Sequence, residues 1–191
     1  MEESLLIKER QLDCTEPKIS DVLEGKFDVL GYYGYPADDA QDYNTYRGGI
    51  LTYLDELDND SDTESDPKDL DQLVSTRYRP ARVYTMYHYP LSRTVFCRFD
   101  LDQVHITNGQ LQYLHALGYQ MIYNKEDDTI RSRSEQVKNI PGMLNRNQTN
   151  GPFGIWGHSI EDLVYNGGST VKIFQDHDGV KAILCDFGCD S

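Results

Sequence analysis

The segment from residue 55 to residue 71 constrains the fold more than any other part of the sequence, because it cannot enter a hydrophobic core. It holds nine Asp and Glu residues, a single basic residue (Lys68), a proline and almost no apolar side chain. A stretch of this composition cannot bury enough apolar surface to offset the conformational entropy that ordering would remove. We therefore predict a solvated acidic loop at about residues 55–71, which separates two parts of one sheet rather than two domains.

The length and the remaining composition are typical of one domain that spans residues 1–191. A chain of 191 residues can bury a substantial core without disulfides or metals. Its 32 acidic and 18 basic residues give a net charge of −14, which disfavours direct binding to a nucleic-acid backbone. The four cysteines have no paired spacing, no apolar leader begins the chain, and no run approaches the roughly 20 apolar residues that span a bilayer. These features predict an intracellular, cytoplasmic protein that is not inserted in a membrane.

The strongest helix signal is a capping box at Thr107. Thr107 can cap the backbone while Gln110 reaches back, and leucines follow at helical spacing up to Gly118, which we expect to end the helix. Ser159 with Asp162 predicts a second, short helix that ends at residues 166–168.

Turn signals and apolar patterns predict the strands. They cover residues 27–33, 50–54, 82–88, 94–99, 119–123, 171–174 and 180–186. Asp178 and Gly179 suit the tight turn of a terminal hairpin. Residues 5–7 and 19–23 fit either a short helix or an edge strand, and the sequence does not decide between them.

Together these patterns predict an α+β fold in a single domain. A mainly antiparallel sheet is expected to carry the helix of residues 107–117 on one face, with the long acidic loop at an edge. His115 lies one position off the leucine stripe of that helix, so we expect it at the surface or at a boundary. The chain has 14 tyrosines, and because tyrosine can pack its ring and keep its hydroxyl in water, part of this excess is expected at a surface or cleft.

Residues 151–163 form the most informative segment, because three glycines surround the only tryptophan, Trp156, and His158 lies just before a predicted helix. Backbone amides at a helix start can hold an anion, and His158 could act as an acid or base beside Glu161 or Asp162. The alternative is structural, with the glycines and Trp156 forming a tight turn that anchors the helix against the sheet. The run Phe-Gly-Ile-Trp-Gly-His followed by an acidic helix resembles a short segment in uncharacterised proteins of large DNA viruses, and this resemblance implies no known activity.

No cofactor or metal is expected from the remaining motifs. Acidic residues alternate in the loop at the spacing of a helix–loop–helix calcium site, but Thr63 replaces the turn glycine and Pro67 intrudes. Cys185, Cys189 and His177 are ligand types that zinc prefers, yet no fourth ligand lies near them in the sequence.

The preferred function hypothesis is a non-catalytic protein-binding or assembly module, viral in origin if the resemblance holds. We expect it to contact another protein through the acidic loop and a tyrosine-rich surface, with Tyr32, Tyr33, Tyr87 and Trp156 as candidate binding residues. For a viral protein the setting would be the host cytoplasm or the virion.

Two alternatives remain open. The first is a small hydrolase or nuclease-like enzyme that uses His158 with Glu161 or Asp162 and with His105, which stands in a short His-x-Thr element. The second is an acidic mimic of nucleic acid, which the net charge favours.

Overall fold

The structure, a computed structural model, describes residues 5–13, 15–29, 31–32, 34–57, 67–102, 105–133, 138–139 and 147–191. Its main element is a six-stranded sheet with the strand order β1-β4-β3-β8-β7-β2. The strands are β1 (Ile7–Asp13), β2 (Ile19–Asp28), β3 (Arg82–Tyr87), β4 (Val95–Leu101), β7 (Val164–Asp176) and β8 (Lys181–Asp190). All neighbouring pairs are antiparallel except β3 and β8, which run parallel. A separate short ladder joins β5 (Lys138–Asn139) to β6 (Asn147–Gln148).

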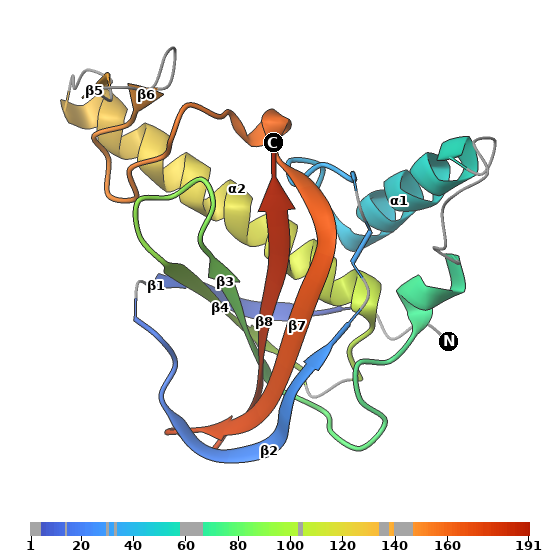
Figure 1. Ribbon diagram of the computed structural model, residues 1–191. Helices are drawn as coiled ribbons and strands as arrows, with labels where there is room; N and C mark the ends of the chain where they lie inside the picture. Colours follow the sequence, from blue (N-terminus) through green and yellow to red (C-terminus); the bar gives the residue numbers. More distant parts are fainter. Residues whose placement is uncertain are drawn as a thin grey trace.

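Helix α2 (Asn108–Arg133) packs against this sheet, and helix α1 (Tyr43–Leu57) packs against α2. Helix α2 crosses one face of the sheet diagonally, and α1 lies near its first half (Figure 1). The rings of Tyr43 and Tyr46 in α1 have their centroids 5.8 and 5.7 Å from the ring of Tyr113 in α2. Two short 3-10 helices, η2 (Pro67–Asp71) and η3 (Ile160–Asp162), lie in the connections. The protein is thus a single α+β domain with a mostly antiparallel sheet, as predicted.

Local sequence signals located several of these elements correctly. The amide of Thr107 donates to Gln110 Oε1 at 3.1 Å, and the amide of Gln110 donates to Thr107 Oγ1 at 3.3 Å, so the capping box begins α2 as expected. The predicted pair at 82–88 and 94–99 is β3 and β4, and the terminal hairpin is β7 and β8. Of the undecided N-terminal segments, residues 19–23 belong to β2, whereas residues 5–7 reach only the first residue of β1, Ile7; β1 and β2 form the two edges of the sheet.

The prediction that Gly118 ends the helix and that residues 119–123 form a strand is wrong. Helix α2 continues to Arg133, and Tyr119, Ile122 and Glu126 extend its buried face beyond Gly118. Gly118 has a packing role instead, since a Cβ at this position would lie 1.7 Å from the hydroxyl oxygen of Tyr87. A residue type that often marks a helix end here makes room for a side chain from β3.

The predicted strand at residues 50–54 is also wrong, because this segment belongs to α1. Its buried residues Tyr46, Ile50 and Leu54 recur every four positions and line one face of the helix. Glycine occupies position 49 of this helix because the hydroxyl of Tyr35 packs against it, and a Cβ there would lie 1.9 Å from that oxygen.

Three further boundaries differ from the prediction. The strand expected at residues 27–33 is the end of β2, which stops at Asp28. The short helix expected after Ser159 is only η3, because β7 already begins at Val164. Most of the predicted acidic loop, residues 58–66, lies outside the described residues, and its flanks form the end of α1 and η2.

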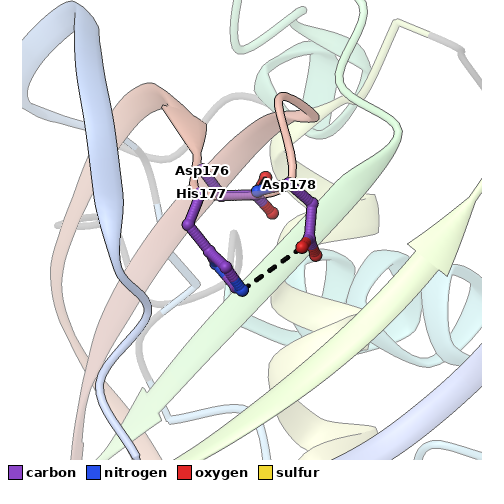
Figure 2. A group of neighbouring side chains, drawn as sticks. All are labelled: Asp176, His177 and Asp178. Carbon is purple, nitrogen blue, oxygen red and sulfur yellow. Dashed lines mark hydrogen bonds and ion pairs between the residues drawn. The ribbon is translucent and has the colours of Figure 1, made fainter.

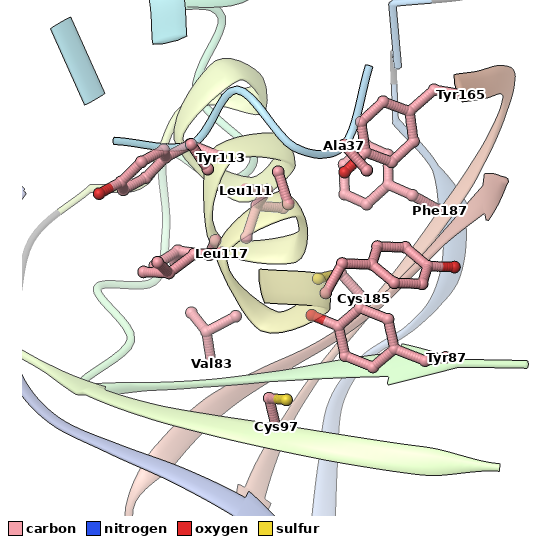
Figure 3. Close-up of a cluster of buried hydrophobic side chains, with 14 of the residues drawn as sticks. Ala37, Val83, Tyr87, Cys97, Leu111, Tyr113, Leu117, Tyr165, Cys185 and Phe187 are labelled. Atoms are coloured by element: carbon pink, nitrogen blue, oxygen red, sulfur yellow. The ribbon is translucent and has the colours of Figure 1, made fainter. Parts of the chain in front are cut away.

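The main hydrophobic core fills the space between α2 and the sheet (Figure 3). Much of the tyrosine excess lies in this core, as Tyr32, Tyr35, Tyr46, Tyr87, Tyr113, Tyr119 and Tyr165. His115 is 0 % exposed and stacks on Tyr87 with ring centroids 4.4 Å apart, so it is a core residue rather than a boundary residue. On the opposite face of the sheet, which we call the open face, the described residues form a small hydrophobic cluster whose buried members are Tyr84, Phe174 and Ala182.

Candidate functional site

One buried carboxylate folds residues 149–154 against α2. Glu126 is 1 % exposed and accepts hydrogen bonds from the amides of Phe153 (2.8 Å) and Gly154 (3.2 Å) and from the hydroxyl of Thr149. Gly151 packs on the same group, since a Cβ there would lie 2.3 Å from the carboxyl carbon of Glu126. Two of the three glycines of residues 151–163 therefore let the backbone close around a carboxylate, which supports the structural explanation of the glycine-rich sequence.

His158 lies just beyond this turn, beside the end of β8. Its carbonyl oxygen accepts a hydrogen bond from the Tyr123 hydroxyl at 3.1 Å. Its Nε2 is 3.4 Å from Ser191 Oγ, and its ring centroid is 5.6 Å from that of Tyr89. In the described part of the chain, no carboxylate forms an ion pair or hydrogen bond with the His158 ring, so the partner that a catalytic histidine needs is not in place.

Glu161 and Asp162 are bonded within their own turn. The amide and the hydroxyl of Ser159 donate to Asp162 Oδ2 at 2.8 and 3.0 Å. These bonds hold the pKa of Asp162 below its usual value, and a hydrogen bond from Ser159 does the same for the pKa of Glu161. The Asp162 carboxylate is thus committed to capping η3 and not to orienting His158.

His105 lies at the start of α2, whereas His158 lies about four helical turns further along it, beside Tyr123. His105 Nδ1 is 3.1 Å from the carbonyl oxygen of Ser75, just before the helix begins at Asn108, whereas His158 contacts Tyr123. Tyr123 is 15 residues further along α2, which corresponds to about 22 Å at about 1.5 Å per residue. The structure therefore does not bring together the two histidines of the enzyme hypothesis.

The candidate binding residues lie in different environments. Tyr32 and Tyr87 are 2 % and 1 % exposed, and the Tyr87 hydroxyl donates to the carbonyl oxygen of His115 at 2.8 Å. This placement gives both tyrosines a packing role and leaves little of either ring at the surface. Trp156 is half-buried, its amide donates to a loop carbonyl at 2.9 Å, and its Nε1 has no hydrogen-bond partner among the described residues. Tyr33 lies outside the described residues.

A hollow of about 570 Å³ lies between α2 and η3, next to His158. We call it the acidic hollow, because Asp38, Glu126, Asp127 and Glu161 line it and no Lys or Arg does. Burial raises the pKa of Asp38, and the negative charges of Asp39 and Glu161 add to the rise. Carboxylates that converge on a concave site in this way focus a negative potential there.

A larger hollow of about 710 Å³ lies where β3 and β8 end, and we call it the sheet-end hollow. Tyr89 lines it, and because the Tyr89 ring is close to His158, the two hollows adjoin. The pairing of β7 with β8 shifts register between Tyr165 and Ser169, and the residues skipped by this shift line the hollow. Its polar and ionisable lining residues are Lys26, Asp28, His88, Tyr89, Tyr119, Asn166, Ser169, Thr170, Asp186 and Cys189.

Asp176, His177 and Asp178 offer three possible metal ligands at the turn between β7 and β8 (Figure 2). Their oxygens are already engaged, however. Asp176 Oδ1 accepts from two backbone amides of the turn, both at 3.0 Å, while Oδ2 accepts from Arg82 at 2.7 Å and Tyr84 at 3.2 Å. Arg82 also donates to Asp178 Oδ2 at 2.8 Å, and this bond lowers the pKa of Asp178. The guanidinium thus supplies the positive charge that a metal ion would bring.

Sequence reasoning missed Asp38 and Asp186, the acidic residues that complete the two hollows. Each is one of many acidic residues in the chain, and neither stands in a motif. Comparisons of the chain with protein-family models, curated proteins and solved structures find no match. Among the described helices, none has the length and apolar character needed to cross a membrane.

Proposed function

We propose that this protein is a non-catalytic binding module that captures a basic segment of a partner protein at the acidic hollow. The observation that carries this proposal is the lining of that hollow, which has four carboxylates and no Lys or Arg. A concave site of one charge sign selects a partner of the other sign and speeds its association.

Three of the four carboxylates have no positively charged partner among the described residues. Glu126 is occupied by the turn of residues 149–154, but Asp38, Asp127 and Glu161 have no ion pair with a basic residue among the described parts of the chain. The raised pKa of Asp38 reports burial and repulsion from Asp39 and Glu161. A lysine or arginine side chain would relieve that repulsion, so bringing it into the hollow should be favourable.

The net charge of −14 supports the same partner chemistry. Long-range attraction of basic segments accelerates encounter, while the hollow provides the local geometry that fixes register. The viral origin and the intracellular setting stay predictions from the sequence.

The test uses a fluorescein-labelled peptide of alternating lysine and glycine, read by fluorescence anisotropy at low and physiological salt. The variant Asp38→Asn with Glu161→Gln removes two charges from the hollow, and we expect its dissociation constant to rise at least tenfold, or about 1.4 kcal/mol. The matched control, Asp21→Asn with Glu24→Gln, removes two exposed charges from the edge strand β2 and should change binding less than twofold. Equal weakening by both variants would show that only total charge matters and would overturn the proposal.

A further inference from the structure

The sheet-end hollow has the position of a ligand site at one end of the sheet, where residues of β2, β7 and β8 line it together with Tyr119 of α2. It lies at the C-terminal ends of β3 and β8, the only parallel pair in the sheet, and the strands of this pair run side by side in Figure 1. Hollows outside the carboxyl ends of parallel strands are frequent ligand sites. The register shift between Tyr165 and Ser169 opens the hollow, and such irregularities often occur next to functional sites.

Asp186 is a carboxylate in this hollow whose only ion-pair partner among the described residues is the exposed ring of His88. His88 Nε2 lies 3.9 Å from the carboxylate, and no hydrogen bond to the Asp186 side chain occurs among the described residues. Burial raises the pKa of Asp186, and the nearby charges of His88 and Lys26 only partly oppose this rise. A half-buried carboxylate without a hydrogen-bond donor is stabilised when a ligand supplies one.

A second carboxylate faces the same space. In the strand register, Asp28 of β2 pairs with Thr170 of β7, and Thr170 pairs with Asp186 of β8, so the three side chains share the open face in a row. Two strand spacings of about 4.8 Å place Asp28 and Asp186 roughly 10 Å apart, with the threonine hydroxyl between them. The aromatic ring of Tyr89 lines the same hollow, and aromatic rings attract organic cations.

We propose that the sheet-end hollow binds a small organic cation through a guanidinium or ammonium group, with Asp186 as its counter-ion. This inference goes beyond the proposed function and does not depend on it, because the acidic hollow has a different lining. The cationic group can come from a free amine or from a side chain of a peptide, and the chemistry of recognition is the same for both.

Lys26 provides an internal test of this proposal. It lies two residues before Asp28, lines the same hollow and is exposed, and it makes no ion pair with Asp186 in the described structure. The ammonium group of Lys26 competes with a cationic ligand for the negative charge of the Asp186 carboxylate. Removing the charge of Lys26 should therefore strengthen binding, whereas removing the charge of Asp186 should weaken it.

The experiment is isothermal titration of the full chain with butylguanidinium, with the uncharged analogue N-butylurea as the ligand control. We expect butylguanidinium to bind and N-butylurea not to bind. Asp186→Asn should weaken binding at least tenfold, Lys26→Met should tighten it about threefold, and Asp21→Asn on the edge strand should leave it unchanged. An unchanged circular dichroism spectrum establishes that each variant is folded.

If butylguanidinium binds, either of two results overturns the proposal: equal binding of the charged and uncharged ligands, or an unchanged affinity of Asp186→Asn for butylguanidinium. Binding of neither ligand overturns it as well. Titration with N-acetyl-arginine N′-methylamide distinguishes the sources, since binding of this probe indicates a peptide side chain and its exclusion indicates a free amine. The Asp38→Asn, Glu161→Gln variant should bind butylguanidinium normally, so failure at one hollow is separable from failure at the other.

Discussion

The buried imidazole of His115 makes the stability of this protein depend on pH in a defined direction. His115 Nε2 lies 3.0 Å from the carbonyl oxygen of Met86, which requires the proton on that nitrogen, and Nδ1 lies 3.4 Å from the hydroxyl of Tyr165. Burial lowers the pKa of His115 to about 3, and the hydrogen bond to Met86 only partly opposes this effect. The folded protein therefore holds this ring neutral at pH values where the unfolded chain protonates it.

The size of the effect follows from the two pKa values. The ordinary histidine value is 6.5, so the unfolded state gains a proton first as the pH falls, and folding loses stability between pH 6.5 and pH 3. At pH 4.5, which is two pH units below the ordinary histidine pKa, protonation of His115 in the unfolded chain lowers the free energy of unfolding by about 2.7 kcal/mol, at about 1.36 kcal/mol per unit. The full contribution is present above pH 6.5. The variant His115→Gln keeps an amide donor for Met86 but cannot titrate, so we expect it not to show this loss of stability between pH 6.5 and pH 3.

Urea denaturation at pH 8, 6 and 4.5 measures the prediction. The free energy of unfolding of the wild type should fall by about 3 kcal/mol more than that of His115→Gln between pH 8 and pH 4.5. Carboxylates titrate in the same range, but they are common to both proteins and cancel in the difference. His177→Gln, at an exposed histidine, should follow the wild type. Parallel pH profiles for the wild type and His115→Gln would refute a neutral buried imidazole.

Two more predictions concern buried polar groups. Arg82→Ala should cost about 3–5 kcal/mol in urea denaturation, because it leaves the fully buried Asp176 without its charged partner, whereas Arg47→Ala at an exposed pair should cost less than about 1 kcal/mol. A loss below 1 kcal/mol for Arg82→Ala would contradict this account. Glu126→Gln should cost about 1–3 kcal/mol, since its amide group cannot accept from both backbone amides, and hydrogen exchange should quicken at Phe153 and Gly154. Exchange rates equal to those of the wild type would count against the anchoring role of Glu126.

The elements predicted correctly from the sequence are those that local signals specify. The capping box at Thr107 and the turn at Asp178 act within a few residues, so their consequences are visible in the chain itself. The errors arise where a distant side chain decides. A glycine at position 118 is a local signal for the end of a helix. In the folded protein, however, Gly118 leaves room for the Tyr87 hydroxyl, and no local sequence pattern indicates that contact.

The candidate sites show the same division. The segment containing His158 was distinctive in the sequence, and it does border a hollow. The carboxylates that give the hollows their chemistry come from far away, since Asp38 precedes His158 by 120 residues and Asp28 precedes Asp186 by 158 residues. Only the folded topology brings them together, so sequence spacing could not identify them.

The position of β8 in the sheet has a consequence for the order in which the molecule is built. This strand lies between β3 and β7 and joins the group β1-β4-β3 to the group β7-β2. During synthesis, β2 is made early but must wait for β7, and the two groups stay unconnected until the final strand inserts between them. Contacts of such long sequence separation form slowly, so a nascent chain carries an incomplete sheet with unpaired edges until β8 has been synthesised and has left the ribosome.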